Sequence, residues 1–299
     1  MVREIWFSGL ILASPVLLLY ERLVPFEIHI LFSQTGIRLL SRGQSSRAGN
    51  STRLSVRSGA NAWCSMTEQH KKTELHGSLS ELVAVPTLKV RLEGMLELPE
   101  KPQGIVLFAH GSGSSRLSPR NNFVARELRT EGLGTLLIDL LTREEDQTYE
   151  TRFDIGLLTV RLADAAQWLR KYPATKSLAL GLFGASTGAA AALRVAADFP
   201  QHVAAVVSRG GRPDLTGDDK LAQVIAPTLL IVGGHDFGVI ELNEETYRKL
   251  KCEKELSIVP GATHLFEESG ALEKVAALAA HWFKRHLHSD APLETQGCS

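Results

Sequence analysis

The sequence predicts an α/β domain with a mainly parallel sheet of about eight strands flanked by helices, between about residue 82 and residue 287. Short runs of aliphatic and β-branched residues alternate with longer segments of helical periodicity, the pattern of strands joined by crossover helices. Some runs, such as GIVLFAHG at 104–111, are apolar almost throughout, as expected for strands covered on both faces. One domain accounts for this whole pattern.

The elements follow one another in a regular order. Two opening segments, 83–90 and 91–99, alternate in polarity and predict a pair of antiparallel strands. Further strands are predicted at 104–111, 134–141, 177–186, 203–211, 226–236 and 254–264. Helices are predicted at 121–132, 153–173, 187–200, 243–252 and 271–287.

The residues outside this pattern divide into a long start and a short end. Residues 1–65 are apolar at first and then rich in Ser and Arg, a composition typical of a disordered linker. We expect either a non-native or dispensable extension, or a membrane anchor or export signal within residues 1–30. The domain itself is expected at 66–288, followed by a flexible tail at 289–299.

Charge and cysteine content narrow the class of protein. Lys plus Arg and Asp plus Glu both total 33, so there is no net field to attract nucleic acid. Three widely spaced cysteines, Cys64, Cys252 and Cys298, match neither a disulfide framework nor a metal site. This cysteine usage favours a cytoplasmic protein, with membrane anchoring or export as the alternative from the apolar start. Neither a phosphate-binding loop motif nor a dinucleotide-binding motif is present.

The segment GLFGASTGAA places Ser186 between an apolar strand and a helix, with Gly184 and Gly188 on either side. A one-residue turn from strand to helix strains the backbone and leaves no room for side chains two residues away, which the glycines provide. Because functional residues gather at the carboxyl ends of parallel strands, we interpret Ser186 as a nucleophile. The alternative is a tight packing turn with an incidental serine.

A serine nucleophile needs a base and a group that orients the base. His264 and Asp236 follow later strands, and the chain order Ser186, Asp236, His264 is nucleophile, acid, base. His235 is then only a neighbour of the acid. Asp139 is the rival acid and fits less well, because it precedes the serine. The remaining alternatives are a surface histidine and a turn aspartate.

The segment HGSGSS, which follows the apolar residues GIVLFA at 104–109, is suited to stabilising an oxyanion. The backbone N–H groups of Ser112 and Thr187 are the expected donors. His110 is expected to anchor this loop rather than act as a second base.

Three arginines, Arg116, Arg120 and Arg209, are predicted on loops near the mouth of the site. They would suit an acidic substrate there, but solvated surface arginines are the commoner case.

Four segments, VLFAHGSGSS, GLFGASTGAA, LLIVGGHD and VPGATHLF, together resemble those of the α/β-hydrolase superfamily, and most of all its dienelactone-hydrolase-like branch. The resemblance covers about Leu82 to Leu287 and implies the α/β-hydrolase fold. It also implies ester hydrolysis through Ser186, Asp236 and His264, by way of an acyl-enzyme and without a metal or organic cofactor. Dienelactone hydrolases proper use a cysteine nucleophile, so we expect a general carboxylesterase acting on small-molecule esters instead.

The length of the connection where a lid would be inserted bears on the size of substrate that we expect. Lids in this superfamily commonly follow the strand predicted at 203–211, yet only residues 212–225 separate it from the next strand. We therefore expect no large lid domain and a preference for short to medium acyl esters. Thioesterases, amidases and acyltransferases use the same three residues and remain alternatives, as does a non-catalytic binding protein of this fold. The oligomeric state is not indicated.

Overall fold

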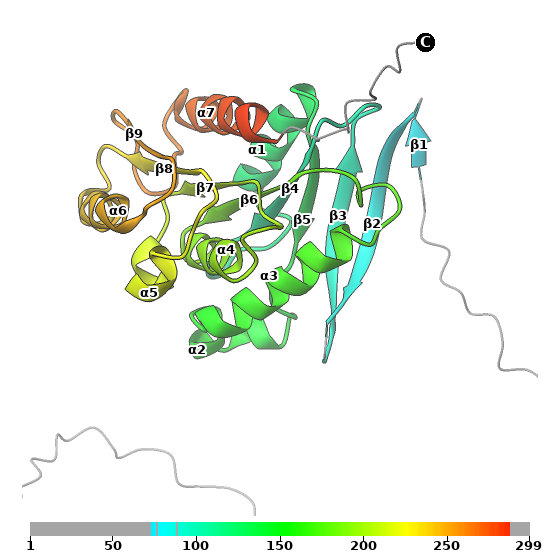
Figure 1. Ribbon diagram of the computed structural model, residues 1–299, viewed down its shortest axis with the longest axis horizontal. Coiled ribbons are helices and arrows are strands. Elements are labelled where there is room, and N and C mark those ends of the chain that lie inside the picture. The colour runs from blue at the N-terminus through cyan, green and yellow to red at the C-terminus, as the bar shows by residue number, and fades with distance from the viewer. Residues whose placement is uncertain (1–72, 76, 88, 288–299) are drawn as a thin grey trace, which may run out of the picture. The chain divides into compact units, whose positions relative to one another are not determined.

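Helices cover both faces of a nine-stranded sheet in the computed structural model, which describes residues 73–75, 77–87 and 89–287 (Figure 1). The strand order is β1-β2-β3-β5-β4-β6-β7-β8-β9. The strands are β1 Thr73–Leu75, β2 Ser78–Pro86, β3 Arg91–Leu98, β4 Ile105–Ala109, β5 Gly134–Ile138, β6 Leu180–Ala185, β7 Ala205–Arg209, β8 Thr228–Gly233 and β9 Lys254–Val259. The helices are α1 Pro119–Thr130, α2 Tyr149–Arg152, α3 Ile155–Leu169, α4 Thr187–Asp198, α5 Asp218–Leu221, α6 Phe237–Lys249 and α7 Ala271–His286, with short 3₁₀ turns η1 Glu145–Gln147 and η2 Pro213–Thr216.

The sheet is mainly parallel, as the sequence predicts. Strands β4 to β9 pair in parallel, while β1, β2 and β3 pair antiparallel and β3 joins β5 antiparallel. The carboxyl ends of all the parallel strands therefore lie along one edge of the sheet. In an open α/β sheet this edge is where ligands bind.

Several boundaries differ from the sequence prediction. The short strand β1 adds a ninth strand, and β2 begins at Ser78 instead of 83. Helix α6 begins at Phe237 instead of 243, directly after the loop that follows β8. The elements α2, α5, η1 and η2 are unpredicted because each is a single turn, too short for a hydrophobic period.

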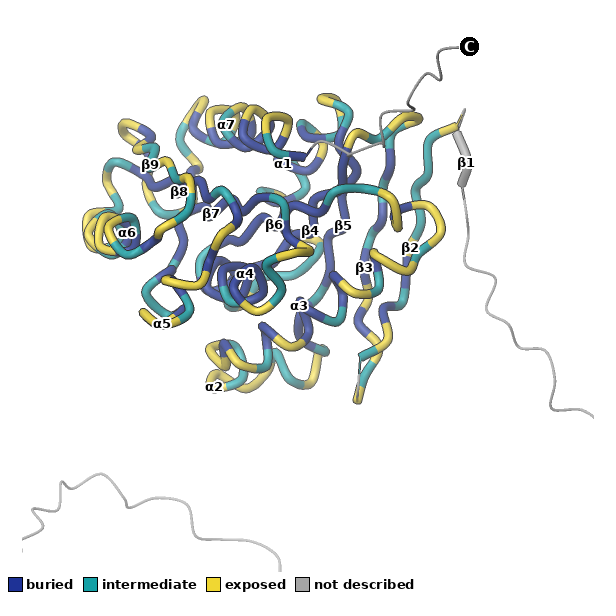
Figure 2. Tube along the Cα trace, viewed as in Figure 1, coloured by how far each residue is buried: buried dark blue, intermediate teal, exposed yellow. Residues whose placement is uncertain are grey.

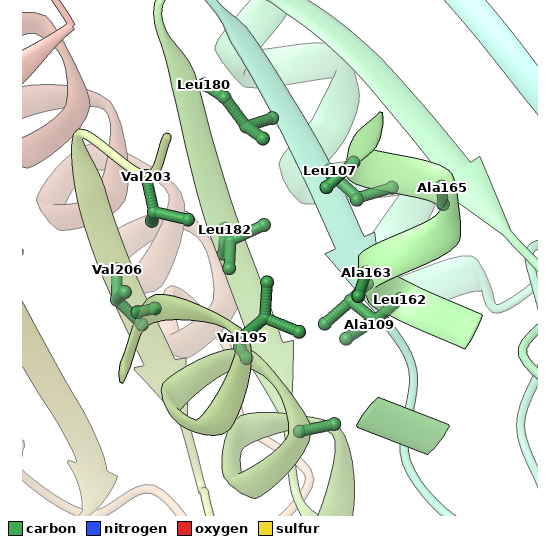
Figure 3. Close-up of a cluster of buried hydrophobic side chains, with 14 of the residues drawn as sticks. Leu107, Ala109, Leu162, Ala163, Ala165, Leu180, Leu182, Val195, Val203 and Val206 are labelled. Carbon is green, nitrogen blue, oxygen red and sulfur yellow. The ribbon is translucent and has the colours of Figure 1, made fainter. Parts of the chain in front are cut away.

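Two hydrophobic layers bury the sheet. Helices α3 and α4 pack on one face and α1 and α7 on the other, and the central strands are buried throughout (Figure 2). On the first face, side chains of β4, β6, α3 and α4 gather in one cluster (Figure 3). Ala189 to Ala192 are fully buried in α4, and their small side chains let this helix lie close to the strands.

The expected extension at 1–65, the start of the expected domain at Met66 and the tail at 289–299 lie outside the described residues. Within the part of the chain that is described, no helix has the length and hydropathy needed to cross a bilayer.

Replacing Phe283 by alanine should lower the free energy of unfolding by about 3–5 kcal/mol, because it removes a fully buried ring between α7 and the sheet. Phe237→Ala is the control, since this ring is 69% exposed and its loss should change stability by about 0.5 kcal/mol or less. Urea unfolding followed by circular dichroism measures both variants. Equal losses would contradict the described packing of α7.

Candidate active site

Ser186 is the single residue between strand β6 and helix α4, and its backbone is strained. Its φ is 50° and its ψ is −121°, a conformation that side chains other than glycine rarely adopt. Its N–H donates to the carbonyl of Arg209 at 3.3 Å, and its own carbonyl accepts from the N–H of Arg212 at 3.0 Å. The neighbouring strand β7 and the loop after it thus hold the turn in place.

Gly184 and Gly188 are required by close approach of the backbone. A Cβ at Gly188 would lie 2.2 Å from the carbonyl oxygen of Ala109, and one at Gly184 would lie 2.4 Å from the Cα of Ala189. Real Cβ atoms do not come this close to backbone, so any side chain would push α4 away from the sheet. The steric reason expected for the two glycines is therefore present.

Asp236 and His264 form a hydrogen-bonded pair at the same edge. Asp236 follows β8 at the start of α6, and His264 follows β9. Nδ1 of His264 lies 2.7 Å from Oδ2 of Asp236, with the side chains 38% and 14% exposed. Because a carboxylate only accepts, Nδ1 carries the proton and Nε2 keeps its lone pair. The histidine is thus held in the tautomer that a general base needs.

Gly210 lies close to His264 and next to the residue that binds the Ser186 backbone. It directly follows Arg209, whose carbonyl holds the Ser186 N–H. A Cβ at Gly210 would lie 3.1 Å from the carbonyl oxygen of His264 and 3.6 Å from its ring carbon Cε1. The Ser186 hydroxyl itself makes no hydrogen bond with any described residue. A bond from the hydroxyl to Nε2 is therefore not formed in this arrangement, as in many resting sites where such bonds tighten only with substrate.

The loop after β4 lies directly against the serine. A Cβ at Gly111 would lie 2.9 Å from the Cβ of Ser186. However, the N–H of Ser112, an expected oxyanion donor, is already used, because it donates to Oγ1 of Thr187 at 3.0 Å. The N–H of Thr187, in the first turn of α4, has no partner among the described residues. The sequence predicts both backbone donors, but it does not predict that the Thr187 hydroxyl accepts a hydrogen bond from one of them.

His110 anchors the loop, as expected. It is buried, its Nδ1 donates to the carbonyl of Gly111 at 2.9 Å, and its Nε2 accepts from the N–H of Leu140 at 2.9 Å. Burial lowers the pKa of His110, and the hydrogen bond to Gly111 opposes this shift. Both nitrogens are occupied, so this imidazole is not available as a second base.

Asp139, the rival acid, has a different partner. Its carboxylate accepts from the backbone N–H of Arg116 at 2.6 Å and from the Arg116 guanidinium, which also pairs with Glu93. These bonds tie the loop after β4 to the end of β5. His235 is exposed beside Phe237, with ring centroids 6.2 Å apart, and makes no bond to the His264 ring.

The three arginines near the mouth differ in their surroundings. Arg116 binds Asp139 and Glu93, and Arg120 binds Glu267 at 2.8 Å. Arg209 is buried, which corrects the expectation of a solvated surface side chain. It is the last residue of β7, and every residue of that strand is buried. Its position in the apolar segment VAAVVSRGG is the sequence signal for this burial.

Two other features concern the chemistry of the site. In the described ranges, no group of three or more His, Cys, Asp or Glu side chains is arranged to hold a metal ion. Cys252 lies before β9, at the end of that strand opposite to His264. Burial raises the pKa of its thiol. It is therefore not a substitute for the serine as nucleophile.

Known proteins similar to this chain share this architecture. A crystallised dienelactone hydrolase from Anabaena variabilis is 54% identical, with a TM-score of 0.69, over 71% of this chain and 100% of that one. Est1E from Butyrivibrio proteoclasticus has a TM-score of 0.59 at 14% identity, over 68% of this chain and 98% of its own. At that identity the likeness shows the fold alone.

A curated relative from Mycobacterium tuberculosis has a different name. It is called a "Putative phosphoribosyl transferase" and is 56% identical over 212 residues, which are 71% of this chain and 48% of that protein. The chain therefore spans about half the length of the curated relatives that it matches.

The sequence profile of the Dienelactone hydrolase family matches residues 92–288, a range that includes the strained serine, the histidine–aspartate pair and the loop after β4. This match extends over most of the described domain and agrees with the mainly parallel sheet and its helices. The chain belongs to the dienelactone hydrolase family and has the α/β-hydrolase fold.

Proposed function

We propose that this chain is a serine-dependent carboxylic ester hydrolase. The observation that carries the proposal is the hydrogen-bonded pair of His264 and Asp236 at the sheet edge where Ser186 stands in a strained turn. The family supplies hydrolase chemistry, and the side chain at 186 supplies an oxygen nucleophile instead of the sulfur expected of dienelactone hydrolases proper.

The residues would act in two half-reactions. The Ser186 Oγ attacks the ester carbonyl carbon while His264 Nε2 takes its proton, and Asp236 stabilises the resulting imidazolium. The tetrahedral intermediate collapses, and the alcohol leaves with the proton from His264. Water then attacks the acyl-enzyme in the same way, which releases the acid and restores the serine. No metal or organic cofactor takes part in this scheme.

We propose that the substrates are small esters with short to medium acyl groups. Between β7 and β8, where a lid would be inserted, the chain forms only η2 and α5, each of four residues. With only these short turns at that place, we expect the edge of the sheet to be open to such substrates. Thioesters and amides remain alternatives, because the same residues would cleave them.

The transferase named in the curated relatives is not part of this proposal. The match covers 48% of those proteins, and residues 92–288 of this chain match the dienelactone hydrolase family. We propose that the transferase name refers to the rest of their length.

Ser186→Ala is expected to lower the turnover of nitrophenyl acetate and butyrate by a factor on the order of 10⁴ or more, because the nucleophile is lost. A fluorophosphonate probe should label the wild-type chain at Ser186, which peptide mass spectrometry identifies. Ser208→Ala is the control, since this serine lies on the adjacent strand β7, is fully buried, and should be neither labelled nor needed. Undiminished turnover in Ser186→Ala would refute the serine mechanism.

Asp236→Asn should lower kcat by a factor on the order of 10³–10⁴, because an amide no longer holds His264 in the required tautomer. Asp139→Asn should cost at least tenfold less than Asp236→Asn, since Asp139 binds Arg116 and not the imidazole. Steady-state kinetics with nitrophenyl butyrate compares the two variants. A larger loss in Asp139→Asn would make Asp139 the acid of the site.

The bond between Ser112 and Thr187 suggests how the oxyanion would be bound. We propose that the Thr187 hydroxyl, polarised by the Ser112 N–H, donates its own proton to the oxyanion beside the Thr187 N–H. Thr187→Val keeps the shape and should lower kcat by about 10–100-fold with little change in KM. Thr187→Ser should keep most of the activity. A kcat for Thr187→Val equal to or above that of the wild type would exclude this role.

A further inference from the structure

Arg209 is buried next to the proposed nucleophile, and the mechanism does not use its side chain. It is the last residue of β7, paired in register with Ala185, and its carbonyl accepts the N–H of Ser186. Its guanidinium carbon lies 5.9 Å from the centre of the Phe266 ring. Phe266 belongs to the hydrophobic layer of α1 and α7, so the cation lies on that face of the sheet.

This guanidinium has no hydrogen-bond acceptor in the described residues. Arg209 is 7% exposed, and its Nε and Nη1 are fully buried without a partner. Nη2 is also unpartnered but is not fully buried, so one end of the guanidinium still reaches accessible surface. A buried cation without a counter-charge or acceptors is strongly unfavourable.

The charge that acts on Arg209 is a second cation. Arg120, at the start of α1, has a buried Nε without a partner, and its Nη1 binds Glu267 at 2.8 Å. Burial, and then the charge of Arg120, lower the pKa of Arg209 to about 10. The group therefore stays protonated at neutral pH, and Glu267 binds Arg120 but not Arg209. One positive charge remains uncompensated.

Another buried arginine shows how this protein compensates such a charge elsewhere. Arg161, in α3, is 4% exposed, and both of its terminal nitrogens bind the carboxylate of Glu145. It also donates to the carbonyl of Leu140 at 2.9 Å. Among the described residues, an acid thus binds one deeply buried guanidinium and none binds the other.

We propose that Arg209, together with Arg120, binds a small inorganic oxyanion such as phosphate beside the active serine. Guanidinium groups match the oxygens of such anions in geometry as well as charge. The uncompensated cation lowers the stability of the folded protein whether or not a substrate is bound. A substrate group that is present only during turnover would not relieve the resting protein, so the anion is a resident one.

The test measures the unfolding midpoint of the full chain as phosphate is raised at constant ionic strength, with a bulky sulfonate salt as the filler. The wild type should gain about 3–5 °C for each tenfold increase in phosphate above the dissociation constant. Arg209→Met should lose this gain. Arg161→Met is the matched control, which should unfold at a lower temperature but keep the full response to phosphate.

Direct binding keeps the proposal testable if Arg209→Met does not fold. Equilibrium dialysis of the wild type with radiolabelled phosphate should give about one anion per chain, and Arg209→Lys should bind at least tenfold more weakly. No binding and no shift in the wild type would overturn the proposal in favour of ordered water. An equal response in Arg209→Met would also overturn it.

A third arm distinguishes a free anion from one carried by the substrate. Ser186→Ala should respond to phosphate as the wild type does, because the anion site does not depend on the nucleophile. If a short ester with a free carboxylate stabilises this variant and phosphate does not, the anion belongs to the substrate and the resident site is refuted. None of these readings depends on esterase activity, so the two proposals fail separately.

Discussion

The left-handed backbone of Ser186 is the constraint on which the rest of the site depends. A strand ends at Ala185 and a helix begins at Thr187, so one residue must reverse the chain. This strain, of order 1–3 kcal/mol, persists because the surroundings over-determine it. Arg209 and Arg212 bind its peptide groups, and the absence of side chains at Gly184 and Gly188 lets α4 approach β4 and β6.

The parallel sheet brings the residues of the proposed site to the same place as this turn. Ser186, Asp236 and His264 follow β6, β8 and β9, and parallel pairing brings the ends of these strands to one edge. The loop after β4 reaches the same edge and is held there by His110 and by the Arg116–Asp139 pair. Each contributor therefore lies just beyond a strand of the sheet, which fixes where its segment begins.

Buried polar groups around this edge fall into two classes. His110 and Arg161 have their hydrogen-bonding capacity met by the chain, and they fix the loops that carry them. Arg209 has no hydrogen-bond acceptor among the residues that the structure describes, although it is buried to a similar degree. Unsatisfied buried groups are rare in native proteins and are often explained by function or by an unseen ligand. By this contrast, Arg161 has a structural role, and Arg209 has a side chain that no described residue satisfies.

The sequence by itself determined the mainly parallel α/β architecture and the candidates Ser186, Asp236 and His264, because strand periodicity and chain order are local or sequential properties. It could not determine the single-turn elements or the early start of α6, which are too short or too dependent on neighbours to leave a periodic pattern. The pairing of Asp139 with Arg116 and the hydrogen bond from the Ser112 N–H to Thr187 were decided only by the tertiary structure. The same holds for the isolation of Arg209. These hydrogen bonds depend on distances between residues far apart in the chain, and no local pattern encodes those distances.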